Sequence, residues 1–182
     1  MNGQTKFVLD KLKEIKKPRV LNIGFRHDSD MTIRDHVRSL GGTFEVLEAY
    51  GPNCQNMINL NSVDQVYELD VRNIEKINDS WDAIIWLHGP EHIYWDEFLD
   101  VRTEIEQKAK KLIIYQAPIG EHPQGELYNN PFEAHVQTLH PEMFQAIGYE
   151  VYSHDGSQTS EYDFLKGENT FSAIVTKEPA SK

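Results

Sequence analysis

Residues 81–92 have the sequence WDAIIWLHGPEH and contain the most informative transition of the chain. The first seven of these residues, 81–87, form an apolar run of strand length that a Gly-Pro turn interrupts. Three ionisable side chains, His88, Glu91 and His92, lie in or next to that turn. Open α/β sheets bind their ligands beyond the carboxyl ends of the strands. The stretch therefore predicts a buried strand whose end carries part of a functional site.

The composition is that of one folded, acidic domain. With 182 residues, 39% hydrophobic and 26% charged, the chain suits a single globular domain over residues 1–182, with an N-terminal helix (1–17) packed on it. Eighteen Lys and Arg against 29 Asp and Glu give a formal charge of -11. Because such a field repels polyanions, we expect no nucleic-acid partner.

The sequence also bears on the compartment. Cys54 is the single cysteine, which excludes an internal disulfide. No apolar stretch approaches the ~20 residues that span a bilayer. Residues 1–17 lack the continuous apolar block of a secretion signal. We expect a cytoplasmic protein without membrane insertion.

Strand-like runs alternate with helical stripes along most of the chain. Ile33, Val37 and Leu40, for example, recur at helical spacing and are followed by Gly41-Gly42. This alternation predicts an α/β fold with a mostly parallel sheet. No helical stripe separates the last two runs, which therefore predict an antiparallel pair. The runs are residues 19–25, 44–47, 66–69, 81–87, 112–117, 149–152 and 171–176.

A long aperiodic segment follows the fifth run. Residues 119–133 are rich in Gly, Pro and Asn and show no helical or strand period. A loop of this length in a compact domain is usually a lid or a binding loop. The segment is therefore a candidate substrate loop.

The first strand-to-helix turn argues against a phosphate ligand. Residues 22–30 read NIGFRHDSD, with Gly24 as the only glycine, whereas a pyrophosphate-binding turn needs several. Asp28 and Asp30 would oppose a phosphate and are suited to cap the helix instead. The turn therefore argues against NAD or ATP as the ligand.

Two acids follow consecutive strands of the predicted sheet. Glu48 ends the second strand, where it can accept hydrogen bonds from ribose hydroxyls, and Asp70 follows the third, where it can meet an adenine amino group. Either acid alone is more simply explained as a loop cap. Their matched positions favour a nucleoside without phosphates.

The succession of segments resembles the class I S-adenosylmethionine-dependent methyltransferases over about residues 18–177. The segments that carry this resemblance are VLNIGF, FEVLEAY, YELDV, WDAIIWLHGPEHI and KLIIYQAP, followed by the terminal strand pair. The HGPEH turn, HPQGELYNNPFEAH (122–135) and FQAIGYEV look like a bacterial subgroup associated with small-molecule or glycan modification.

This resemblance implies a three-layer, Rossmann-like α/β fold whose seven-stranded sheet is mostly parallel with an antiparallel terminal strand. It implies S-adenosyl-L-methionine as the cofactor and a small-molecule or glycan acceptor, methylated on a hydroxyl or amine. It places His88 near the cofactor. The further cofactor contacts that it implies are Asn22, Gly24, Phe25 and Arg26 for the methionine part, Glu48 for the ribose, and Asp70 and Val71 for the adenine.

Two residues of the first turn depart from the family pattern. The family usually has an acid where Asn22 stands and a second glycine where Arg26 stands. Arg26 either pairs with the carboxylate of the cofactor or fills the pocket. The second case predicts a methyltransferase-like binding or scaffold protein without catalysis.

The chemistry of methyl transfer suggests roles for the residues after the fourth strand. The reaction is an in-line displacement, and a hydroxyl acceptor must lose its proton. A histidine suits this role, so His92 is the first candidate for the base, with Glu91 orienting it or the acceptor. His135, on the far side of the substrate loop, is the second candidate.

A metal site is the alternative use of the same turn. His88, Glu91 and His92 are all of residue types that bind zinc or iron. Gly89-Pro90, however, resists the helix that would place both imidazoles on one face. From the sequence we therefore expect no metal.

Overall fold

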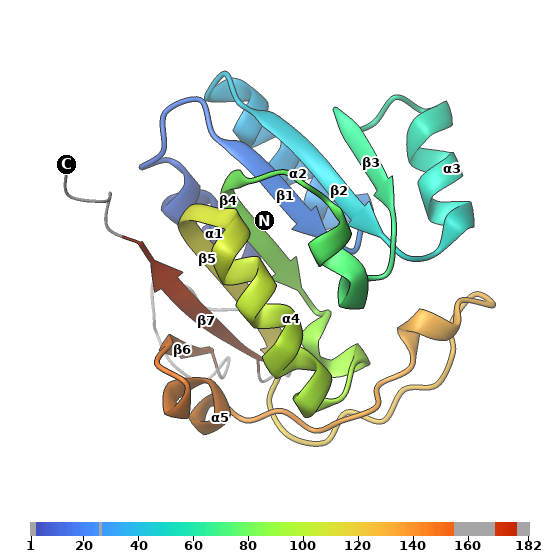
Figure 1. Ribbon diagram of the computed structural model, residues 1–182, viewed down its shortest axis with the longest axis vertical. Helices are drawn as coiled ribbons and strands as arrows, with labels where there is room; N and C mark the ends of the chain where they lie inside the picture. The colour runs from blue at the N-terminus through green and yellow to red at the C-terminus, as the bar shows by residue number, and fades with distance from the viewer. Residues whose placement is uncertain (1–2, 26, 155–169, 178–182) are drawn as a thin grey trace.

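The structure is a computed structural model that describes residues 3–25, 27–154 and 170–177. Within these ranges seven strands form one sheet (Figure 1). The strands are β1 (Arg19–Ile23), β2 (Thr43–Glu48), β3 (Gln65–Glu68), β4 (Trp81–Leu87), β5 (Ala109–Pro118), β6 (Glu150–His154) and β7 (Thr170–Thr176). The α-helices are α1 (Gly3–Leu12), α2 (His27–Ser39), α3 (Gly51–Asn59), α4 (Trp95–Lys108) and α5 (Pro141–Ala146). The short 3₁₀ helices are η1 (Val71–Lys76), η2 (Pro90–His92) and η3 (Pro131–Glu133).

The sheet has the order β3-β2-β1-β4-β5-β7-β6. The first five strands of this order run parallel, and Ile23 of β1 is in register with Leu47 of β2 and Trp86 of β4. β7 lies antiparallel to both β5 and β6. The predicted mostly parallel sheet with a reversed terminal strand is confirmed.

Helices cover both faces of the sheet, which makes three layers. On one face, α1, α2 and α3 bury apolar side chains such as Phe7, Ile33 and Met57 against the strands. On the other face, η1, α4 and α5 do the same, with Phe98 and Phe144 among the fully buried residues. Figure 1 shows α4 in front of the sheet and α2 behind it. Because side chains alternate along a strand, each central strand contributes to both cores.

Two predicted elements, one strand and one helix, are longer than those in the structure. The strand expected over residues 19–25 ends at Ile23, because Gly24 takes a left-handed conformation (φ 73°) that turns the chain out of the sheet. The N-terminal helix expected over residues 1–17 ends at Leu12, although Ile15 beyond it is still buried. Among the helices that the structure describes, none is long and apolar enough to cross a membrane.

Candidate functional site

A pocket of about 840 Å³ opens at the carboxyl ends of the parallel strands. The turn after β1, the end of β2, the start of η1 and the turn after β4 contribute its walls, and the long loop after β5 closes one side. The pocket gathers nine of the eleven residues that the sequence suggested for a site: Gly24, Phe25, Glu48, Asp70, Val71, His88, Glu91, His92 and His135.

The two remaining candidates are placed differently. Asn22 does not line the pocket: it is 1% exposed, and its amide donates hydrogen bonds to the backbone oxygen of Gly24 (2.6 Å) and to Asp30 (3.0 Å). Asn22 therefore shapes the turn from behind the pocket wall. Arg26 lies outside the described residues. Among the described residues, a Cβ atom at Gly24 would meet nothing within 4 Å.

Glu48 is a buried acid at the end of β2. It is 6% exposed and accepts hydrogen bonds from the backbone N–H of Tyr50 (2.8 Å) and the side chain of Asn53 (3.4 Å). Burial raises the pKa of Glu48 above its ordinary value, and the negative charge of Glu133 in the long loop adds to the shift. The carboxyl group is thus readily protonated for a glutamate.

Asp70 sits before η1 and has the opposite character. Its carboxylate accepts the backbone N–H of Arg72 (2.9 Å) and forms an ion pair with the guanidinium of the same residue (2.6 Å). Partial burial alone would raise the pKa of Asp70, but the hydrogen bonds from Arg72 outweigh it, so the pKa lies below its usual value. Asp70 therefore stays ionised as a hydrogen-bond acceptor.

The turn after β4 is tightly packed. His88 has a positive φ of 50°, and its backbone N–H donates to the carbonyl of Gln116 on β5 (2.8 Å). At Gly89 a Cβ atom would lie 1.6 Å from Nε1 of Trp86, so only glycine fits. As expected, Gly89-Pro90 interrupts any helix across His88 and His92: Gly89 is not helical, and the short η2 begins only at Pro90, which is well tolerated in the first turn of a helix.

The long loop is attached to this turn by hydrogen bonds. The backbone N–H of Val136 donates to the carbonyl of Glu91 (3.0 Å), and the side chain of Gln137 donates to the carbonyl of Pro90 (2.8 Å). The loop contributes further pocket residues that the sequence did not single out individually, although all of those named here lie within the segment HPQGELYNNPFEAH. They are His122, Gln124, Leu127, Asn130 and Phe132.

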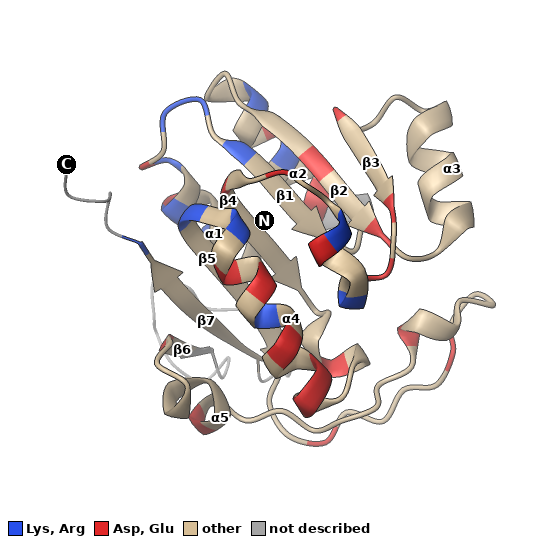
Figure 2. Ribbon diagram, viewed as in Figure 1, with Lys and Arg blue, Asp and Glu red and all other residues tan. Residues whose placement is uncertain are grey.

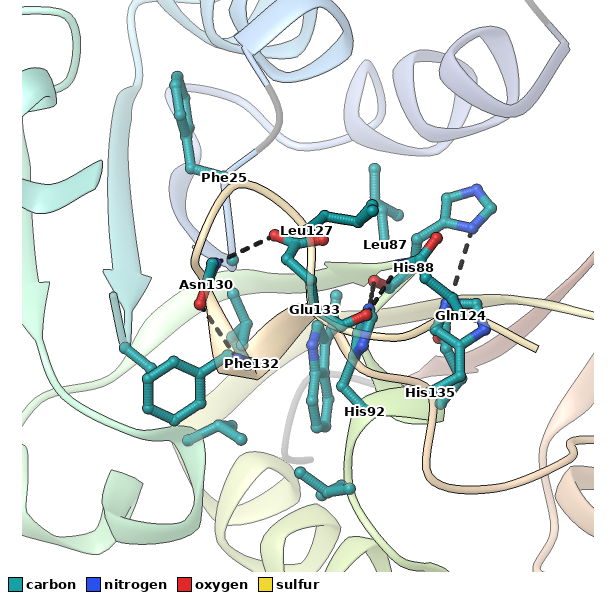
Figure 3. Close-up of a pocket in the computed structure, with 18 of the residues that line it drawn as sticks. Phe25, Leu87, His88, His92, Gln124, Leu127, Asn130, Phe132, Glu133 and His135 are labelled. Carbon is teal, nitrogen blue, oxygen red and sulfur yellow. Dashed lines mark hydrogen bonds and ion pairs between the residues drawn. The ribbon is translucent and has the colours of Figure 1, made fainter. Parts of the chain in front are cut away.

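Glu91, His92 and His135 meet at one end of the pocket. One potential ligand atom from each side chain lies within 4.8 Å of the others. The rings of His92 and His135 are 4.9 Å apart at an angle of 70°, and Figure 3 shows them side by side. The expectation of no metal considered only His88, Glu91 and His92 within the turn. It did not include His135, which the fold of the long loop brings to the cluster.

The pocket has a negative electrostatic character. Arg72 is the only Lys or Arg among the described residues that line it. Figure 2 shows acidic and no basic positions along residues 119–140. A field of this sign attracts cations and repels phosphate groups. The acids that line the pocket are Asp30, Glu48, Asp70, Glu91, Glu121 and Glu133.

Cys54 does not contribute a nucleophile. Its thiol is buried, donates to the backbone carbonyl of Glu48 (3.3 Å), and does not line the pocket. Burial raises the pKa of Cys54 to about 12, so the reactive thiolate is not populated near neutral pH. This agrees with a structural role.

Comparison with known proteins identifies the fold. No protein-family model matches the sequence, and no curated protein matches it either. Among solved structures, a SAM dependent methyltransferase from Archaeoglobus fulgidus has a TM-score of 0.60 at 16% identity, covering 95% of this chain and 94% of its own. TehB from Haemophilus influenzae has a TM-score of 0.64 at 11% identity, and the matched region covers 95% of this chain but 62% of TehB.

A third similar structure contains bound small molecules. Coclaurine N-methyltransferase, bound to N-methylheliamine and SAH, has a TM-score of 0.67 at 8% identity, covering 94% of this chain and 70% of its own. At these identities the comparisons establish the architecture. The chain has the Rossmann-like fold of the class I SAM-dependent methyltransferases, as the sequence resemblance implied.

The close contact at Gly89 makes a prediction about stability. In Gly89→Ala the new methyl group would overlap the indole of Trp86, so we expect the free energy of unfolding in urea to fall by about 1–3 kcal/mol. The matched control is Gly125→Ala, whose Cβ would meet nothing within 4 Å. Equal unfolding midpoints for the two variants would contradict the packing described for the turn.

Proposed function

We propose that this protein binds S-adenosyl-L-methionine and transfers its methyl group to a hydroxyl or amine of a small molecule or glycan precursor. One observation carries the proposal. A single pocket joins the Gly24 turn and the acids Glu48 and Asp70 to the cluster Glu91, His92 and His135. The first group suits a nucleoside cofactor, and the second suits an acceptor.

The cofactor is proposed to lie along the strand ends. The ribose hydroxyls donate to Glu48, and the adenine amino group donates to Asp70, with the ring packed on Val71. The methionine part follows the open turn at Gly24 and Phe25, and His88 lies near the sulfur. The negative field of the pocket favours the positive sulfonium of this cofactor and disfavours nucleotide phosphates.

The comparisons support a cofactor and a small acceptor of this kind. The structure of the coclaurine enzyme holds SAH together with N-methylheliamine on a similar fold. Another structure with a TM-score of 0.59 is a complex of DhpI with SAH. In this chain, the long loop that carries His135 forms the wall against which an acceptor is proposed to bind.

The proposed reaction is a displacement at the methyl carbon. A lone pair of the acceptor oxygen or nitrogen forms the new bond, and the carbon–sulfur bond breaks with its electrons passing to sulfur. The cofactor leaves as the uncharged thioether SAH, and the proton of the acceptor passes to a base. Glu91, His92 and His135 provide the groups at this end of the pocket.

His92 needs a small rearrangement to act as that base. Its Nδ1 lies 3.1 Å from the carbonyl oxygen of Ala134, and its Nε2 lies 3.1 Å from that of His88. A ring nitrogen can accept a proton only when its lone pair faces the acceptor. In the proposed reaction, the imidazole therefore turns away from one carbonyl as the acceptor binds.

Binding of SAH provides the first test. SAH should raise the melting temperature of the protein, since a ligand that binds the native state alone stabilises it. In Glu48→Gln, SAH affinity measured by calorimetry should fall about tenfold or more, because a charged acceptor of two hydrogen bonds is lost. Glu68→Gln, on the neighbouring strand and outside the pocket, should bind SAH as the wild type does. A melting temperature that changes with neither SAM nor SAH would contradict the proposal.

The raised pKa of Glu48 predicts a pH dependence of binding. Below its pKa the carboxyl group is neutral and accepts hydrogen bonds from the ribose less strongly, so SAH affinity should decrease as the pH falls. Because burial raises this pKa, the loss should begin at a higher pH than it would for an ordinary glutamate. Calorimetric titrations of Glu48→Gln over the same range should show a clearly smaller dependence. Identical pH profiles would refute the ribose contact.

The role of His92 is tested by separating turnover from cofactor binding. With an acceptor found by screening small hydroxyl and amine compounds for SAH release, His92→Ala should lower kcat about 100-fold or more. Its SAH affinity should change by less than about twofold, since His92 does not contact the nucleoside in the proposed arrangement. His140→Ala, an exposed histidine outside the pocket, is the control. Near-normal turnover of His92→Ala would remove it from the mechanism.

A further inference from the structure

We propose that Glu91, His92 and His135 form a binding site for one divalent transition-metal ion. Two imidazoles and one carboxylate form a ligand set suited to Zn²⁺, Mn²⁺, Fe²⁺ or Co²⁺. One potential ligand atom of each side chain already lies within 4.8 Å of the other two. Ligand atoms around a tetrahedral ion are about 3.4 Å apart, so side-chain shifts of about 1 Å would close the site.

The hydrogen bond of His135 leaves one ring nitrogen free to bind a cation. Its Nδ1 lies 2.5 Å from the carbonyl oxygen of His122. A carbonyl can only accept, so Nδ1 carries the hydrogen and Nε2 keeps its lone pair. Metal-binding histidines typically show this arrangement, in which the second nitrogen donates to a backbone oxygen and fixes the ring.

His92 has a conflict that a cation would resolve. Both of its ring nitrogens face carbonyl oxygens at 3.1 Å, those of Ala134 and His88. A neutral imidazole has one N–H, so the other nitrogen opposes a carbonyl with its lone pair. This separation is close to the distance of about 3.4 Å between two ligand atoms of one tetrahedral ion. A metal ion bound to both this ring nitrogen of His92 and the carbonyl oxygen that it faces would replace the repulsion with two coordination bonds.

Glu91 lacks the hydrogen bonds that a buried carboxylate requires. It is 1% exposed, and neither carboxylate oxygen accepts a hydrogen bond from the residues that the structure describes. Nδ1 of His88 lies 3.7 Å from Oε1, beyond hydrogen-bond distance. Buried ionised groups are normally paired or coordinate a metal. Glu91 lines the pocket beside His92, where a cation would neutralise it.

The position of the ion also suggests its role, and this part rests on the proposed function. The cluster lies at the acceptor end of the pocket, so the positions that protein ligands leave free would face the acceptor. A metal ion there would bind the acceptor oxygen and lower the pKa of its hydroxyl group, so that the proton leaves to water at neutral pH. His92 would then act as a ligand and would not have to accept that proton.

The test is metal binding by the full chain produced without a polyhistidine tag. After treatment with EDTA and dialysis, the wild type should take up one equivalent of Co²⁺, seen by visible absorption, and Zn²⁺ should displace it. Glu91→Gln and His135→Gln should each weaken Co²⁺ binding at least about tenfold. His140→Gln, which changes an exposed histidine outside the cluster, should bind Co²⁺ as the wild type does.

Melting temperatures show whether the variants fold. Glu91→Gln keeps the size of the side chain and removes a buried carboxylate that accepts no hydrogen bond from the described residues, so the metal-free variant should melt no lower than the metal-free wild type. Zn²⁺ should raise the melting temperature of the wild type but not of Glu91→Gln. The proposal would be overturned if the wild type failed to bind Co²⁺. It would also be overturned if Glu91→Gln and His135→Gln both bound Co²⁺ as tightly as the wild type.

SAH binding separates this proposal from the proposed function. Glu91→Gln should lose Co²⁺ and keep SAH, and Glu48→Gln should do the reverse. A wild type that binds Co²⁺ through the cluster but not SAH would refute the methyltransferase proposal and leave the metal site supported. A wild type that binds SAH but no Co²⁺ would refute the metal site alone.

Discussion

The packing of Gly89 against the indole of Trp86 is the contact on which the site depends. The indole belongs to the core, with ring centroids 6.1 Å from Phe98 and 6.2 Å from Tyr115. Because a Cβ atom at Gly89 would lie 1.6 Å from the indole, the chain can pass this point only as glycine. The direction in which the chain leaves β4, and hence the position of Glu91 and His92, is therefore set by the core. Groups held in this way are suited to precise chemistry.

Two acids at neighbouring strand ends, Glu48 and Asp70, show how the surroundings of similar side chains shift their pKa values in opposite directions. Glu48 is buried without a cationic partner among the described residues, and its pKa is raised. Asp70 is held by Arg72, and its pKa is lowered. Both line the pocket, yet Glu48 should take up its proton at a higher pH than Asp70. The cofactor proposal therefore predicts a pH dependence that originates at the ribose and not at the adenine.

Much of the fold could be predicted because its signals are local. The apolar run over residues 81–87 matches β4 residue for residue, and the other six strands were found with boundaries within a few residues. The strand-end candidates followed from topology, since parallel strands end at one edge of a sheet. Sequence position gives the turn that contains Asn22, but not that its side chain supports the backbone from behind the pocket.

The sequence by itself determined the α/β class, the parallel sheet, and the pocket edge that carries Gly24, Glu48, Asp70 and the turn after β4. Tertiary structure alone decided that His135 joins Glu91 and His92. The contacts that fix this arrangement join residues far apart in the chain: His92 and Ala134 are 42 residues apart, and Gln137 and Pro90 are 47 apart. An aperiodic loop has no local sequence pattern that predicts which segment it packs against. Its position follows from hydrogen bonds to the turn after β4, and these exist only once the sheet has formed.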